Sequence, residues 1–198
     1  HAVDIAFGKD NTNLTLLKKD LDYMFWFDAS YTNEDIECIR TFARIFNNLS
    51  LTTQFEDEDI MLGDLKNNYN EPSYHYYNIR LVPDQYLDYY KDKVYSSKNE
   101  DIIRDKKGKV IGYQSSDYVI LWNGLSQKDR NYFITKSLFW SCGLRGESDS
   151  HKDSFFYNRA NMSATLSSLD KEAIKLLYGG KLDNNMNSKN VRKELAIS

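Results

Sequence analysis

The segment from Thr32 to Leu49 limits the possible folds of this chain most, because its apolar residues recur at helical spacing. These residues are Ile36, Ile39, Phe42, Ala43, Phe46 and Leu49. Residues three and four positions apart share one face of an α-helix, so the segment predicts a helix with one broad apolar stripe. Thr32 and Asp35 form a variant of the capping box, which predicts that the helix begins there. Such a stripe must be covered by another layer of the protein.

Strand-like runs on both sides of this helix indicate what that layer is. They are short, rich in aromatic and β-branched residues, and bounded by polar or turn residues. They predict strands at residues 21–27, 51–55, 74–82 and 117–122, and a hairpin over 102–113 that turns at 105–108. The covering layer is therefore expected to be a β-sheet.

Two further helices are predicted in the second half of the chain. One starts at the capping residue Ser126 and stops at Gly143, and the last one covers about 169–178. The order of elements predicts the α/β (α+β) class, with a twisted mixed sheet covered by helices. The 198 residues contain no repeat and no linker, so we expect a single domain with a polar lead-in over 1–20 and a polar tail over 181–198.

The overall composition excludes some classes of function. The formal net charge is -3 and the isoelectric point is near 5.7, whereas a nucleic-acid-binding protein needs a basic face. No apolar run is long enough to span a bilayer, and no signal-peptide pattern occurs. The expected partners therefore do not include nucleic acid, and no transmembrane segment is expected.

The two cysteines, Cys38 and Cys142, leave two alternatives open. An even pair is compatible with one disulfide. It is equally compatible with two buried thiols, because free cysteine is among the residue types most often buried.

The segment over 129–157 is where a chemical site is expected. It resembles the active-site helix and following loop of metzincins, whose pattern is H-E-x-x-H-x-x-G-x-x-H and then a Met-turn. In that pattern two histidines on one helix face bind zinc, the glutamate is the general base, and a glycine turns the chain toward a third histidine. Gly143 matches the glycine, and Phe156 falls near the methionine of the Met-turn.

The zinc ligands of this pattern are replaced. Lys136 stands at the first histidine, Ser137 at the glutamate, Trp140 at the second histidine and Glu147 at the third. A protonated lysine has no lone pair, and the tryptophan indole offers only an N–H donor, so neither can ligate zinc. The resemblance therefore implies a zincin-like fold without bound zinc and without protease activity.

The end of the chain extends the resemblance. Residues 166–179 are similar to the closing helix of matrixin-type domains, and the match covers roughly 21–179. The chain looks closer still to an uncharacterised family of secreted or lipid-anchored prokaryotic proteins in the zincin clan, which also lack the two histidines. This implies a non-catalytic module with a binding or structural role, outside the cell or at its surface. The sequence leaves the oligomeric state and the presence of a leader or lipid anchor open.

The zincin layout implies two features of the vacant metal position. Lys136 and Glu147 both point toward it, so they could form an ion pair; the alternative is that each is solvated. The strand that borders the cleft in zincins could pair with an extended peptide by β-augmentation. The candidates for that strand are Val110, Ile111, Gly112 and Tyr113. A protein or peptide is thus the expected partner.

Two other functions are compatible with the same region. Ser137, Glu147 and His151 could form an unorthodox, metal-free hydrolase site, although no third orienting residue is identifiable for a serine and histidine pair. The loop that carries Glu147, Asp149, His151 and Asp153 could bind calcium, because calcium takes several oxygen ligands. The simpler alternative for this loop is a solvated polar segment.

Overall fold

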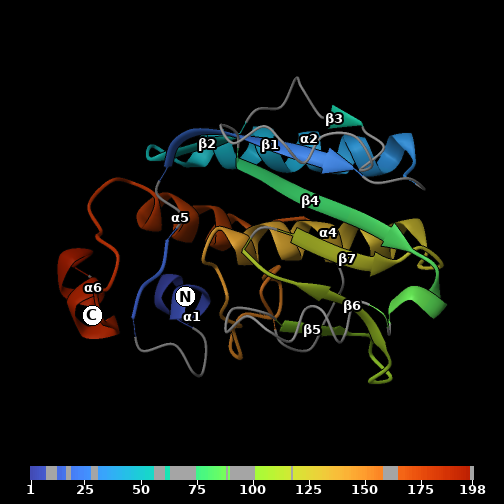
Figure 1. Ribbon diagram of the computed structural model, residues 1–198. Coiled ribbons are helices and arrows are strands. Elements are labelled where there is room, and N and C mark those ends of the chain that lie inside the picture. The colour runs from blue at the N-terminus through green and yellow to red at the C-terminus, as the bar shows by residue number, and fades with distance from the viewer. Residues whose placement is uncertain are drawn as a thin grey trace.

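The computed structural model (Figure 1) describes residues 1–7, 13–16, 19–27, 31–55, 61–62, 75–87, 89, 101–116, 118–157 and 165–196. Only the backbone is described at 19–27, 61–62 and 75–76. In chain order the elements are α1 (Ala2–Phe7), β1 (Lys19–Phe27), α2 (Asn33–Leu49), β2 (Thr53–Phe55), β3 (Met61–Leu62), β4 (His75–Val82), β5 (Asp101–Arg104), β6 (Val110–Gln114), β7 (Tyr118–Trp122), α4 (Gln127–Ser141), α5 (Ser168–Leu177) and α6 (Ser188–Glu194). The predicted mixed α/β class is confirmed.

The strands form one mixed sheet in the order β2-β1-β4-β7-β6-β5, and β3 also pairs with β1. β1 runs parallel to β2, β3 and β4, and β4 runs parallel to β7. The last two pairings, β7 with β6 and β6 with β5, are antiparallel. The antiparallel pairings are therefore confined to the β7–β6–β5 end of the sheet, and Figure 1 shows β7 next to α4.

The proposed role of Val110, Ile111, Gly112 and Tyr113 as an open, groove-bordering strand is wrong. These residues form β6, whose Gly112 pairs with Leu121 of β7 on one side and with Ile103 of β5 on the other. A strand with neighbours on both sides has no free backbone edge for an added peptide. The hairpin that the sequence predicted places β5 outside β6, so β5 is the outer strand of the sheet as described.

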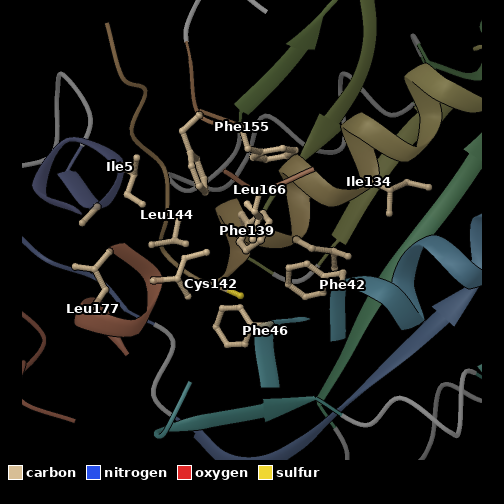
Figure 2. Packing of buried hydrophobic residues seen from close by; sticks show 14 of the residues in the cluster. Ile5, Phe42, Phe46, Ile134, Phe139, Cys142, Leu144, Phe155, Leu166 and Leu177 are labelled. Atoms are coloured by element: carbon tan, nitrogen blue, oxygen red, sulfur yellow. The ribbon is translucent and has the colours of Figure 1, made fainter. Parts of the chain in front are cut away.

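Helices α2 and α4 pack against each other, and their apolar faces meet the main core of the protein. Figure 2 shows Phe139 of α4 beside Phe42 of α2, with ring centroids 4.9 Å apart. The predicted capping box of α2 is present: the Thr32 side chain accepts from the Asp35 backbone, and the Asp35 side chain accepts from the Thr32 backbone. Asp35 is also ion-paired with Arg130 of α4 at 3.1 Å, so one residue both starts α2 and joins the two helices.

The described part of the expected polar lead-in over 1–20 is largely buried, whereas most of the described residues of the polar tail over 181–198 are exposed. Five of the six residues of α1 are buried, and so are Leu14 and Leu16. In the tail, α6 buries Val191, and Leu182 is buried before it. Helix α1 packs on α5 and α6, so both ends of the chain lie together in Figure 1. The apolar residues of such short helices show no clear periodicity, and their burial depends on contacts between distant parts of the chain.

Candidate functional site

Helix α4 and the loop after it bring to one cavity the four positions that the resemblance aligns with the zinc ligands and the general base of metzincins. The cavity has a volume of about 230 Å³ and lies between α4 and the outer strand β5; we call it the α4–β5 cavity. The four replaced positions all line it: Lys136, Ser137, Trp140 and Glu147. Its other lining residues are Asp101, Ile102, Ile103, Arg104, Gln114, Phe133 and Arg145. The sequence motif therefore identified four residues that share one space, three from a helix and one from the following loop.

The Lys136–Glu147 ion pair is formed, with 3.1 Å between Lys136 Nζ and Glu147 Oε1. The pair is only partly shielded, because the side chains are 35% and 43% exposed. Burial lowers the pKa of Lys136, but Tyr132, Glu147 and Asp101 together outweigh it, so the net shift of this pKa is upward. Lys136 therefore remains a cation at neutral pH and is held at the mouth of the cavity.

Partial exposure limits what this ion pair adds to stability. We expect Glu147→Gln to lower the free energy of unfolding by less than about 1 kcal/mol, since solvent screens half-exposed pairs. Urea unfolding of this variant beside Glu172→Gln, which removes the exposed ion pair of Lys175, measures the difference. A loss of roughly 3 kcal/mol for Glu147→Gln alone would mean that the pair behaves as a desolvated one.

Ser137 is buried and its hydroxyl is already engaged. Ser137 Oγ donates to Gln114 Oε1 at 2.7 Å, and both residues are buried. A glutamine amide does not titrate near neutral pH, so it cannot take the serine proton as a general base would. His151 is not among the residues that line the cavity; its ring packs edge-on against His1 with centroids 4.9 Å apart. The structure thus brings Ser137 and Glu147 together but gives His151 a different neighbour.

Arg145 is a residue of this site that the sequence analysis missed. Its guanidinium lies over the Trp140 ring, 4.1 Å from the ring centre. Its Nε is buried and has no hydrogen-bond partner among the described residues. Burial lowers the pKa of Arg145. The only signal in the sequence was its place between Gly143 and Glu147, two positions of the motif.

The loop that carries Arg145 and Glu147 is anchored at three points. Leu144 N–H donates to the Phe139 carbonyl, Gly146 N–H to the Ile5 carbonyl, and Ser148 N–H to the Phe156 carbonyl. The acceptor of the second bond, Ile5, lies in α1, within the segment expected to be a polar lead-in. The N-terminal helix therefore helps to position one wall of the cavity.

Gly143 and Phe156, the other two motif positions, support the site without lining it. Gly143 ends α4 with φ of 97°, a conformation that favours glycine. Phe156 is buried, and its ring packs 5.4 Å from Phe139 and 5.2 Å from Phe155. Together they fix where the helix ends and where the following loop returns.

The donor set of the cavity does not fit a zinc ion. Among its carboxylates, Glu147 is paired with Lys136, and Asp101 accepts from the Ile102 backbone at 2.8 Å. Within the part of the chain that the structure describes, no three His, Cys, Asp or Glu side chains are grouped to hold a metal ion. Calcium binding by the loop with Asp149 and Asp153 stays a prediction.

The two cysteines are free thiols, which decides between the two alternatives left open by the sequence. Cys142 is fully buried at the end of α4, and burial raises its pKa. Cys38 lies in a second cavity of about 300 Å³ between α2 and α4. Its pKa is raised to about 11, mainly by burial, because the Thr135 hydrogen bond that lowers it is the smaller effect.

These thiols should react slowly in the folded protein. Cys38 is almost entirely protonated at pH 7.4, and the thiolate is the nucleophile, so we expect little iodoacetamide labelling until the protein unfolds. In urea without reductant, mass spectrometry should show both cysteines labelled. Labelling in urea that requires prior reduction would contradict the free-thiol arrangement. Because the folded pKa lies above the ordinary 9.0, burial of this thiol should stabilise the fold below pH 9 and lose that effect as the pH approaches 11.

None of the helices that the structure describes combines the length and the apolar character needed to cross a membrane. Comparison with models of known protein families gives no match, and a search of curated proteins finds no similar sequence. The resemblance to zincins therefore rests on the motif positions and on the order of elements.

Proposed function

We propose that this chain is a zincin-fold module without a catalytic site, which binds an extended peptide segment in the α4–β5 cavity and does not cleave it. The observation that carries the proposal is that Lys136, Ser137, Trp140 and Glu147 line this one cavity. None of the first three has the chemistry of the residue it replaces. By the resemblance, the module acts outside the cell or at its surface.

The order and direction of the elements support the zincin fold. Strand β1, the long helix α2, further strands and then β7 lead into α4, and α5 and the short helix α6 follow later in the chain. Up to α5, this is the order that the resemblance implies. The side of the sheet next to the motif helix also ends in antiparallel strands, which leaves β5 as the strand beside the cavity.

The ion pair at the replaced zinc position supports a non-catalytic role. A zinc ion would need neutral nitrogen, thiolate or carboxylate ligands around it. Lys136 instead supplies a fixed ammonium, and Glu147, at the third ligand position, neutralises it at 3.1 Å. The Ser137 hydroxyl donates to Gln114 rather than to a base, which argues against the alternative of a metal-free hydrolase.

The position of β5 as the outer strand supports the proposal that the bound peptide is extended. All four residues of β5 line the cavity, so a strand added beside β5 would lie along it. Within the described residues, β5 pairs with β6 only. Backbone hydrogen bonds to an added strand provide affinity, and side-chain pockets provide selectivity. Trp140 and Phe133 offer the apolar surface that such a segment would cover.

An array of end-capped extended peptides tests this function. The wild-type protein should retain a subset of the peptides, and mass spectrometry should show them uncleaved. Trp140→Ala removes a cavity wall and should abolish retention, whereas Lys128→Ala, at an exposed position of α4 outside the cavity, should not. Absence of any retained peptide contradicts the proposal. Cleavage that disappears in Ser137→Ala contradicts it in favour of the hydrolase.

A further inference from the structure

The α4–β5 cavity contains one half-buried cation, Arg145, without a described carboxylate partner. Of its three basic residues, Lys136 is paired with Glu147, and Arg104 donates to the Gly108 carbonyl at 3.0 Å from an exposed position. No described carboxylate lies within ion-pair distance of Arg145. Arg104 and Arg145 both lack a described carboxylate partner, but Arg104 is exposed to solvent, whereas Arg145 is half-buried and its Nε is shielded from water.

The surroundings of Arg145 are those of an incomplete binding site. The Trp140 ring that its guanidinium covers offers no lone pair for an ordinary hydrogen bond, so the ring does not satisfy the Nε–H group. The Nε atom is buried without a partner among the described residues, and a buried donor without a partner is unfavourable. A carboxylate would satisfy it, because a guanidinium can bind both carboxylate oxygens at once.

We propose that the segment bound in the α4–β5 cavity carries an aspartate or glutamate side chain, and that Arg145 binds its carboxylate. This inference rests on the proposed peptide-binding function and adds the chemistry that selects the peptide. Arg145 is well suited to this selection, because the anchored loop and the Trp140 ring hold it in place before binding.

The carboxylate belongs to a side chain rather than to a chain end. Strand β5 borders the cavity over its whole length, from Asp101 to Arg104, so a segment paired with it passes through the cavity. A segment that passes through presents side chains, which alternate in direction along a strand. Alternate side chains of the segment would thus face Trp140 of α4 and Arg145 of the loop that follows it.

Three matched sets of peptides test this selection. Each set shares the same varied extended sequences, with Glu, Gln or Ala fixed at the central position and both ends capped. Binding is measured by fluorescence anisotropy for the wild type, Arg145→Gln, Arg145→Lys and the control Arg44→Gln, which removes an exposed charge on α2. Melting temperatures show that each variant is folded.

We expect the wild type and the control to bind Glu peptides about tenfold or more tightly than Gln peptides. Arg145→Gln should remove this preference and leave binding of the Ala peptides unchanged. Arg145→Lys should keep part of the preference, because it retains the charge but not the paired N–H groups. Higher salt should weaken Glu binding more than Gln binding.

The contrary outcomes distinguish a failure of the Arg145 assignment from a failure of the proposed peptide-binding function. Binding without a Glu preference, or with a preference that Arg145→Gln leaves intact, overturns the role of Arg145 while peptide binding stands. If the same sequences bind only when their C-terminus is left uncapped, the carboxylate comes from a chain end, which overturns the assignment to an aspartate or glutamate side chain. Absence of binding by all three sets, including the Ala peptides, overturns the proposed function as well.

Discussion

Gly143→Ala is expected to destabilise the protein by about 4 kcal/mol or more, the largest effect of any alanine substitution proposed for this chain. Two causes combine. The backbone at Gly143 has φ of 97°, which L-residues rarely adopt. An added Cβ would also lie 1.7 Å from the Thr15 carbonyl oxygen, and a backbone atom has little freedom to move away. Thermal unfolding should show a decrease in Tm of roughly 10 °C or more.

Gly108→Ala is the matched control for this substitution. Gly108 also has positive φ, at 81°, but an added Cβ there meets nothing within 4 Å. It should therefore cost only about 1–2 kcal/mol, from backbone strain alone. Equal losses for the two variants would contradict the close approach of Thr15 to the end of α4. A large loss at Gly143 alone would show that the N-terminal segment is packed there.

Asp170→Asn is expected to cost about 3–5 kcal/mol, because it disrupts a buried carboxylate that accepts five hydrogen bonds. Asp170 is fully buried at the start of α5. It accepts from Ser154 Oγ at 2.6 Å, His1 Nε2 at 2.7 Å, Phe155 N at 2.8 Å, Ser167 Oγ at 2.8 Å and Ser167 N at 2.9 Å. Asparagine has the same shape, but its NH₂ group replaces one carboxylate oxygen and would point at N–H and O–H donors.

Asp129→Asn provides the comparison for Asp170→Asn. Asp129 holds the same third position in α4 and bonds to the capping residue Ser126, but its bond is exposed to solvent. Its substitution should cost no more than about 1 kcal/mol. Urea unfolding at an unchanged m-value measures both variants. If both substitutions lowered the free energy of unfolding by the same small amount, Asp170 would act only as a helix cap. Its bonds to His1 and to the 154–155 turn would then add nothing to stability.

Both predictions concern the supports of the cavity rather than its lining. Gly143 directs the chain into the loop with Arg145 and Glu147, and α1 anchors that loop through the bond from Gly146 to Ile5. Asp170 holds His1 next to α1 and also holds the turn before Phe156. Partial loss of either support should therefore loosen the cavity wall before it affects the sheet.

Local sequence patterns were sufficient to predict the main helices and strands and part of the candidate site. The stripe of α2, its capping box at Thr32, the hairpin over β5 and β6, and the stop at Gly143 depend on residues close in sequence. The same holds for Lys136, Ser137 and Trp140, whose helical spacing places them on neighbouring turns of α4. These features were predicted because the interactions that define them act within a few residues.

Features that depend on distant contacts were missed or assigned wrongly. Residues 110–113 were expected to form an open edge, but β6 is paired on both sides, because hydrophobic alternation marks a strand and does not say which strand is outermost. Arg145 was passed over, since its contact with Trp140 and its unpartnered Nε exist only when the loop folds back on α4. The sequence does not distinguish a free cysteine from one in a disulfide, so only the positions of Cys38 and Cys142 in the structure decide between the two alternatives.

The sequence by itself predicted the longer elements, the starts of α2 and α4 and the side chains at the motif positions, because each depends on side-chain chemistry at short spacing. Only the tertiary structure decided that β5 is the outer strand of the described sheet, that α1, Leu14 and Leu16 contribute to the core, and that one cavity holds both Arg145 and the Lys136–Glu147 pair. The physical reason is that burial, charge balance and edge exposure are properties of the spatial neighbours of a residue. In this chain those neighbours come from segments far apart in the sequence, such as Thr15 against Gly143.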